Sequence, residues 1–299
     1  MEIYRRHLEN TQFLDQRVEM VNSTEKINGN CVFCGGELDV LVSYQRPPKG
    51  ETNFDLKPYW RRLLKCVKCG HSVNQHHFKF DADFYSKRYS ASTYKGQMQT
   101  RFKKIMSLPF VSSDNQQRFD FISKFITKFG GSPPSRCLDV GSGLGVFPAL
   151  LKEAGWTCTA LEPDPVACEL ISELVGVKTI NANLMDVKNI GLFDLITFNK
   201  VIEHVQNPVS FLAASKIFLR PGGLIYIEVP DGETALNTNG TESEEFFIEH
   251  FDIYSKKSLG YLINNAGLEI LSLQNVNEPS GKFTIRGFAK IQGSSTLDD

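Results

Sequence analysis

Four of the seven cysteines stand in two closely spaced pairs, Cys31 with Cys34 and Cys66 with Cys69. Each pair has two residues between its members and a glycine after the second cysteine, so both thiolates can reach one tetrahedral metal ion. Four thiolates complete the coordination shell. We therefore expect a structural Zn²⁺ ion with no open position for catalysis. Two redox-active pairs or buried free thiols are the alternatives.

The nearby histidines and the remaining cysteines are not expected to bind this metal ion. His71, His76 and His77 lie close to the second pair, but four thiolates suffice, and we expect these histidines to be non-ligands. The three remaining cysteines fall in strand or helix patterns and are expected to pack in the core. They are Cys137, Cys158 and Cys168.

A glycine-rich turn follows an apolar run at residues 139–145, which read Asp-Val-Gly-Ser-Gly-Leu-Gly. Such a turn between a strand and a helix lets the backbone approach a ligand and points helix N–H groups at it. A dinucleotide fingerprint would need a further glycine at position 146, which is Val146. The next strand ends in Glu162, where a carboxylate can accept both hydroxyls of a ribose. That acid argues against a 2′-phosphorylated ligand.

Alternating strands and helices must position these side chains. Ser113 and Asp114 are expected to cap a helix whose apolar face is Phe119, Ile122, Phe125, Ile126 and Phe129. We then expect strands at 136–140, 157–161, 193–198 and 224–229, and helices at 147–154, 165–175 and 208–219. A helix over 258–265 and a hairpin of strands near 268–276 and 283–291 complete the chain. This alternation predicts an α/β fold with a mostly parallel sheet.

The order and spacing of residues 139–145, Glu162, 193–205 and 219–229 resemble the class I S-adenosylmethionine-dependent methyltransferases over about residues 115–291. The resemblance implies a Rossmann-like sheet with a closing antiparallel strand. It also implies that Asp139, Gly141 and Gly143 hold the methionine end of the cofactor, while Glu162 takes the ribose hydroxyls. The remaining cofactor-site residues that we assign are Ser142, Gly145, Asn183, Leu184 and Asn199. Asn183 and Leu184 would lie beside the adenine, although the family often has Asp where Asn183 stands.

Residues 245–254 carry a second set of chemical groups, ending in Glu249-His250-Phe-Asp-Ile-Tyr254 before Ser255. With the four cysteines, this segment is similar to the sugar C-methyltransferases of deoxysugar pathways and to enzymes of surface-polysaccharide clusters. A Pro-Leu-Ala-Asn segment of those sugar enzymes is absent. We expect His250 to act as the base, supported by Glu249 and Tyr254, because a histidine near neutrality suits proton removal. His204 is the second choice, and packing roles are the alternative for both histidines.

The net charge of −1 is a cancellation between two unlike halves. Residues 1–135 hold 21 Lys and Arg against 13 Asp and Glu, and residues 136–299 hold 12 against 21. Basic clusters in the first half are interleaved with aromatic residues; they are Arg61-Arg62-Lys65-Lys68, Lys87-Arg88 and Arg101-Lys103-Lys104. These groups could hold the pyrophosphate and base of a nucleotide-sugar, grip RNA by phosphate contacts and stacking, or form only a solvated basic face. For the whole chain we expect a methyltransferase acting on a small anionic acceptor, with a nucleotide-sugar favoured; a zinc-ribbon RNA methyltransferase and a non-catalytic zinc-dependent binding module are the alternatives.

Composition and length bound the architecture. The 299 residues are 41% hydrophobic and 22% charged, which is typical of a globular protein. No apolar run approaches a membrane span or signal peptide, so we expect a cytoplasmic protein without membrane insertion. The expected divisions are a tail over 1–30, a zinc-ribbon-like module over 31–80, an aromatic and basic helical linker over 81–131, and a methyltransferase domain over 132–299.

Overall fold

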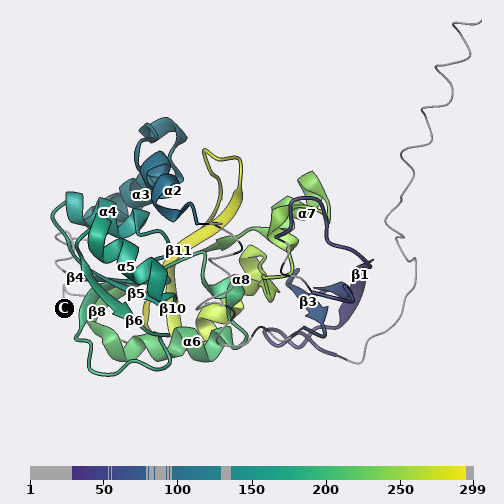
Figure 1. Cartoon of the computed structure of the whole chain (residues 1–299). Helices are drawn as coiled ribbons and strands as arrows, with labels where there is room; N and C mark the ends of the chain where they lie inside the picture. The colour runs from purple at the N-terminus through teal and green to yellow at the C-terminus, as the bar shows by residue number, and fades with distance from the viewer. Residues whose placement is uncertain are drawn as a thin grey trace, which may run out of the picture.

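Two β-sheets organise the chain in the computed structural model, which describes residues 29–52, 54, 56–78, 80, 84, 92, 94, 96–128 and 136–293 (Figure 1). The larger sheet has seven strands in the order β10-β11-β8-β7-β4-β5-β6, and the smaller has four in the order β1-β2-β3-β9. Within the described ranges, no helix is long and apolar enough to cross a membrane.

The larger sheet is parallel except at one end. Its parallel strands are β4 (Arg136–Val140), β5 (Thr157–Glu162), β6 (Lys178–Asn181), β7 (Phe193–Asn199) and β8 (Leu219–Pro230). The hairpin of β10 (Leu268–Asn277) and β11 (Phe283–Ile291) then closes the sheet, with β11 antiparallel to β8. This arrangement is the predicted Rossmann-like sheet with a closing antiparallel strand.

Helices cover both faces of the sheet because successive strand residues point to opposite sides. On one face, α3 (Asp114–Lys128) and α4 (Val146–Glu153) pack on Cys137, Leu195 and Phe288. On the other, α6 (Pro208–Ala214) and α8 (Lys256–Asn265) pack on Leu138 and Ile196. The remaining helices are α2 (Met98–Met106), α5 (Pro165–Leu174) and α7 (Gly232–Asn239).

Most expected elements are confirmed within a residue or two. Ser113 caps α3 as expected, because its hydroxyl oxygen accepts from the Gln116 N–H at 3.3 Å. On the expected apolar face, Ile122 and Ile126 are buried. Phe129 lies outside the described residues. The expected helix over 208–219 was wrong at its end, because α6 stops at Ala214 and a 3₁₀ turn follows over Ser215–Phe218. β8 then begins at Leu219 rather than 224, since Leu219 already pairs with Phe193.

The smaller sheet joins distant parts of the chain. Antiparallel strands β1 (Leu38–Tyr44), β2 (Arg61–Cys66) and β3 (Ser72–His76) come from the first half. The fourth, β9 (Asp252–Ile253), directly follows His250 and pairs antiparallel with β3. The expected module over 31–80 therefore shares its sheet with the second half, and its boundaries stay a prediction. The first 28 residues and most of 81–95 lie outside the described part.

A buried ion pair fastens α3 to the sheet. Arg118 is 5% exposed and Glu228, on β8, is 0% exposed. The guanidinium donates to both carboxylate oxygens of Glu228, and the Tyr226 hydroxyl donates to the same carboxylate at 2.6 Å. Although burial opposes ionisation, Arg118 lowers the pKa of Glu228 to about 2. Removal of either partner would leave a charge buried and uncompensated.

We predict that Arg118→Met destabilises the fold by about 3–5 kcal/mol, because it leaves Glu228 unpaired. Urea unfolding at neutral pH measures this loss. Because the pKa of Glu228 is depressed, the wild-type contribution is complete above the unfolded-state pKa and is lost as the pH falls towards 2. The control is Lys124→Ala, which breaks an exposed pair with Asp120 and should cost about 0.5 kcal/mol or less. Equal losses in the two variants would contradict the prediction.

Candidate active site

A cleft of about 810 Å³ opens at the carboxyl ends of β4, β5 and β7. In doubly wound sheets, ligands bind at this edge, where the chain changes direction across the sheet. The lining includes the glycine turn after β4 at one end and His204 and His250 at the other. The volume is in the range of small-molecule sites. One cavity therefore joins the two groups of residues that the sequence singled out.

The turn after β4 brings the backbone close to the cleft. Gly141 has a φ of 72°, and a Cβ there would meet the Val201 side chain at 2.6 Å, so the position requires glycine. At Gly143 a Cβ would meet only the Tyr94 hydroxyl, at 4.0 Å, which leaves room for a ligand. Gly145 does not line the cleft; a Cβ there would meet Ile171 at 2.8 Å, which indicates a packing role.

Asp139 is held at the end of β4 by hydrogen bonds from β7. The Thr197 hydroxyl and the Asn199 amide donate to the same carboxylate oxygen at 2.6 and 2.8 Å. Ser142 donates its hydroxyl to the Asp139 carbonyl at 3.0 Å. Burial raises the pKa of Asp139 to about 6 despite these donors. Strand β7 thus fixes the Asp139 carboxylate, and the turn is tied to the backbone of the same residue.

Glu162 lies at the tip of β5 and is 7% exposed. Its carboxylate accepts from the Gly143 N–H at 2.8 Å and from the Asp164 N–H at 3.0 Å, one bond to each oxygen. Burial raises its pKa to about 7, although these two donors oppose the shift. Each oxygen keeps a lone pair for a further donor. Glu162 can therefore accept the two hydroxyls of a ribose while its orientation stays fixed.

The lining at the glycine-turn end also includes Asn183 and the buried Leu184. Asn183 accepts from the Met185 N–H at 3.0 Å through its side-chain oxygen, which orders the turn after β6. Tyr94 and Arg101 also line this end, with the guanidinium 5.6 Å from the ring centre. Neither was predicted as a site residue, because their segment carries no motif and only its aromatic and basic composition stands out.

Two histidines face each other at the other end. The ring centres of His204 and His250 are 4.8 Å apart with a 68° angle between planes. His250 Nδ1 lies 2.8 Å from the Glu245 carbonyl and His204 Nδ1 lies 3.0 Å from that of Glu249, so each Nδ1 carries the proton. Burial lowers the pKa of His250 to about 4 and that of His204 to about 3. The expectation of a histidine with a pKa near neutrality was therefore wrong, because burial disfavours the charged ring; His250 is a neutral imidazole whose unprotonated nitrogen is Nε2.

The two expected supporting residues are placed differently. Glu249 lines the cleft, and burial raises the pKa of its carboxyl to about 7. Tyr254 is not among the lining residues. It is fully buried, with its ring centre 5.9 Å from that of Phe33 and 5.6 Å from that of His71. The structure thus brings His204, Glu249 and His250 together and places Tyr254 in the packing beneath them.

The loop that carries His250 is held by strand β3. The Asn74 amide donates to the carbonyls of Phe246, Phe247 and His250 at 3.2, 3.0 and 2.8 Å. His71 bonds to Asp252 at 2.9 Å, and Ser255 donates its hydroxyl to the Cys69 carbonyl at 2.5 Å. Residues beside the second cysteine pair therefore position the candidate base.

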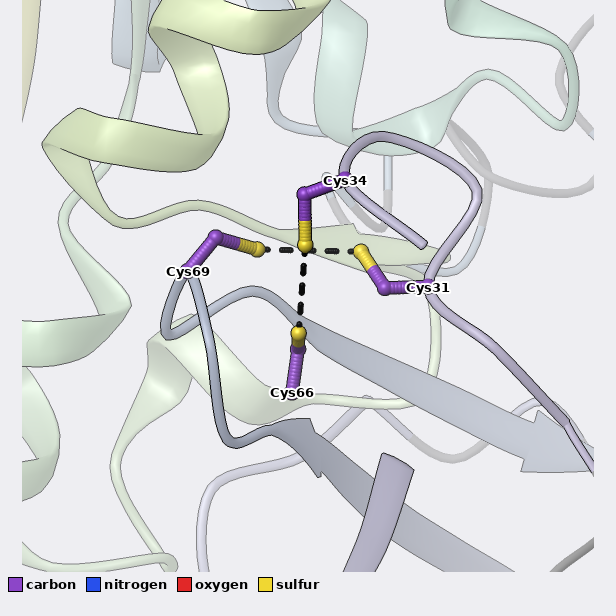
Figure 2. A group of neighbouring side chains, drawn as sticks. All are labelled: Cys31, Cys34, Cys66 and Cys69. Carbon is purple, nitrogen blue, oxygen red and sulfur yellow. Dashed lines mark hydrogen bonds between the residues drawn. The ribbon is translucent and has the colours of Figure 1, made fainter. Parts of the chain in front are cut away.

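The four paired cysteines converge, as Figure 2 shows. The sulfur atoms of Cys31 and Cys69 are 3.7 Å apart, and those of Cys34 and Cys66 are 3.5 Å apart. A tetrahedral zinc ion with bonds of about 2.3 Å separates its sulfur ligands by about 3.8 Å. Gly36 must approach closely, because a Cβ there would meet Cys66 Sγ at 2.9 Å. The donor set and its spacing fit a four-thiolate zinc site without His71.

One member of the basic clusters is buried, whereas Lys68, Arg101, Lys103 and Lys104 are exposed. Arg61 is fully buried, and its guanidinium bonds to Glu51 at 3.2 Å and to Asn74 at 2.7 Å. Glu51 in turn accepts from the Ile248 N–H at 2.8 Å. Arg61 therefore supports the His250 loop rather than a basic surface. The cluster Lys87-Arg88 lies outside the described residues.

The fold and the cleft are those of a class I S-adenosylmethionine-dependent methyltransferase. Residues 115–273, more than half of the chain, match the family model described as a methyltransferase domain, and the chain belongs to this family.

Curated relatives are methyltransferases at low identity. A ubiquinone biosynthesis O-methyltransferase of Xanthomonas campestris is 26% identical over 120 residues, which cover 38% of this chain and 48% of the relative. An enzyme of the same name from Colwellia psychrerythraea is 28% identical over 126 residues, covering 38% and 51%. The chain spans about half the length of these relatives.

Solved structures share the fold. The magnesium protoporphyrin IX methyltransferase of Synechocystis, with bound S-adenosylhomocysteine, has a TM-score of 0.52 at 12% identity, covering 71% of this chain and 98% of that one. The 1,6-didemethyltoxoflavin-N1-methyltransferase of Burkholderia thailandensis has a TM-score of 0.50 at 17% identity, covering 75% and 96%.

We predict that Glu162→Gln weakens S-adenosylmethionine binding by about 10- to 100-fold, because a hydrogen bond to a charged group contributes about 1.5–3 kcal/mol. Wild-type affinity should fall as the pH drops below about 7, where Glu162 becomes protonated. In the variant, the affinity should keep only the pH dependence that arises from protonation of Asp139 near pH 6. Calorimetry at several pH values measures both effects. Glu169→Gln, an exposed change on α5, is the control, and a Glu162 variant of wild-type affinity would contradict the assignment.

Proposed function

We propose that this protein transfers a methyl group from S-adenosylmethionine to a small polar acceptor, with a nucleotide-linked sugar favoured. The observation that carries the proposal is the single cleft between Glu162 and His250. S-adenosylmethionine would supply a methyl group already activated by its positively charged sulfur. Asp139, Gly141, Gly143 and Glu162 would hold it, so that the donor faces the histidine end. A cleft of about 810 Å³ suits a small acceptor better than an RNA chain.

The residues at the histidine end would prepare the acceptor. We assign proton removal to His250 Nε2, whose tautomer is fixed by the Glu245 carbonyl. For carbon methylation the proton leaves a carbon beside a carbonyl group, and for oxygen methylation it leaves a hydroxyl. The acceptor's electron pair then attacks the methyl carbon in line with the breaking S–C bond. His204 packs against His250 and would limit its rotation.

The four cysteines would hold a structural zinc ion that steadies the same end of the cleft. Its contribution would be indirect. The ion would fix the two turns that carry the cysteine pairs, and β3 would then fix the loop that carries His250 through Asn74. Reduced thiolates fit a cytoplasmic location, which we also propose. Arg61 is paired with Glu51, but the exposed basic residues would remain available for the phosphates of a nucleotide-sugar.

We predict that His250→Ala keeps S-adenosylmethionine affinity within about twofold and lowers turnover by about 100- to 10,000-fold, the range for loss of a general base. Incubation with nucleotide keto-sugars in D₂O tests the same step, because deuterium should enter beside the carbonyl only when His250 is present. His77→Ala, an exposed change on the module, should leave both readings unchanged. Undiminished turnover in His250→Ala would remove His250 as the base.

We predict that the purified protein contains one zinc ion per chain and that Cys66→Ser loses it. Because the loop is then released, turnover should fall by about 10- to 100-fold while cofactor affinity is kept. Asn74→Ala separates the two effects: it should retain zinc and show the same loss of turnover. Metal analysis together with calorimetry decides the matter. Well under one zinc per wild-type chain, or normal turnover in both variants, would contradict this account.

A further inference from the structure

Glu203 occupies an unusual position at the acceptor end of the cleft. It lies on the 3₁₀ turn Ile202–His204 that follows β7, lines the cleft, and is 1% exposed. Its carboxyl group and the ring nitrogens of His204 and His250 lie within 4.8 Å of one another. Its own carbonyl accepts from the Phe251 N–H at 2.8 Å. This backbone bond fixes Glu203 relative to the loop that carries the base.

One carboxyl oxygen of Glu203 is buried without a hydrogen-bond partner in the described part of the chain. The cations that line this end of the cleft are bound elsewhere. Arg118 pairs with Glu228, Lys200 pairs with Glu278 at 2.5 Å, and Lys282 pairs with Glu244 at 3.0 Å. A buried polar atom with no partner is costly. The oxygen therefore points to a group that a ligand would supply.

The surroundings favour the protonated form of this carboxyl. Burial raises the pKa of Glu203 to about 8, with Glu228 on β8 adding to the shift. Its own N–H, Lys200 after β7 and Lys282 before β11 oppose it. Three further titratable groups lie on the neighbouring loop and strand, and they are Glu249, His250 and Tyr254. At neutral pH the protonated carboxyl group of Glu203 thus lies beside the neutral imidazole of His250. The difference in their environments suits Glu203 to act as the acid and His250 to act as the base.

We propose that Glu203 is a catalytic residue that, as a neutral carboxylic acid, donates a hydrogen bond to an acceptor oxygen while His250 removes the proton. This inference rests on the proposed methyl transfer. With a keto-sugar, the proton moves to His250 Nε2 and the C–H electron pair moves towards the carbonyl oxygen. The Glu203 O–H stabilises the negative charge there. The enolate carbon then bonds to the methyl group, the S–C bond breaks, and S-adenosylhomocysteine leaves. His250 later releases its proton to water.

The test compares Glu203→Gln with Glu203→Ala at saturating S-adenosylmethionine, with a thymidine-diphosphate keto-deoxysugar as the probe acceptor. The glutamine amide keeps a donor that cannot ionise, so this variant should keep turnover within about tenfold of wild type. The alanine variant should lose about 100-fold or more. Wild-type turnover should fall above about pH 8, where the acid ionises, and Glu203→Gln should lack that fall. Both variants should bind the cofactor normally in calorimetry.

Two results would overturn the assignment. Wild-type turnover that rises through pH 8, with an inactive Glu203→Gln of normal cofactor affinity, would make Glu203 a carboxylate base. Infrared difference spectra of the S-adenosylhomocysteine complex, wild type minus Glu203→Gln, should show a protonated carboxyl band at pH 7 that disappears by pH 9; absence of that band at pH 7 would also overturn it. If wild type transfers no methyl group to the probe, the proposed acceptor fails, while the infrared titration still decides the state of Glu203.

Discussion

The pairing of β3 with β9 is the constraint on which the arrangement of the histidine end of the cleft depends. Only two residue pairs form it, Ser72 with Ile253 and Val73 with Asp252. It sets Asn74 beneath the His250 loop and His71 beside Asp252. The turns that carry the cysteine pairs and the loop that carries the candidate base are consequently attached to the same small sheet. The same core cluster extends from Cys31 and Phe33 to α8 and the large sheet, so the two sheets are packed as one body.

Burial governs the protonation states throughout the cleft. It raises the pKa values of Asp139, Glu162 and Glu203, and it lowers those of the two histidines. Three of the cations that line the cleft are paired with carboxylates, as Arg118 is with Glu228. At neutral pH the two histidines and Glu203 are therefore mainly neutral, whereas the pKa of Glu162 lies close to 7. A ligand that brings a positive charge or hydroxyl donors favours the ionised form at the cofactor end.

The sequence predicted the parts of the site that local patterns encode. The glycine turn, Glu162 and the closing hairpin follow from spacing and alternation, because the strand period and the turn residues are read locally. The edge strand β6 and the polar helix α7 were missed, since neither carries an apolar pattern over enough residues. Tyr94 and Glu203 were missed for another reason, because their placement depends on burial and on neighbours distant in sequence. Tyr254 was expected to support His250, but it is fully buried and does not line the cleft.

The two-residue strand β9 has a consequence for how the protein is made. Ser72 and Ile253 pair although most of the chain separates them. Contacts between such distant residues close late, because loop-closure entropy opposes them until the intervening segments are compact. During synthesis the glycine turn and Glu162 can reach their places while residues 244–254 are still unmade. The glycine-turn end of the cleft can therefore form first, and the histidine end becomes complete only after residues 252–253 have been made and have paired with β3.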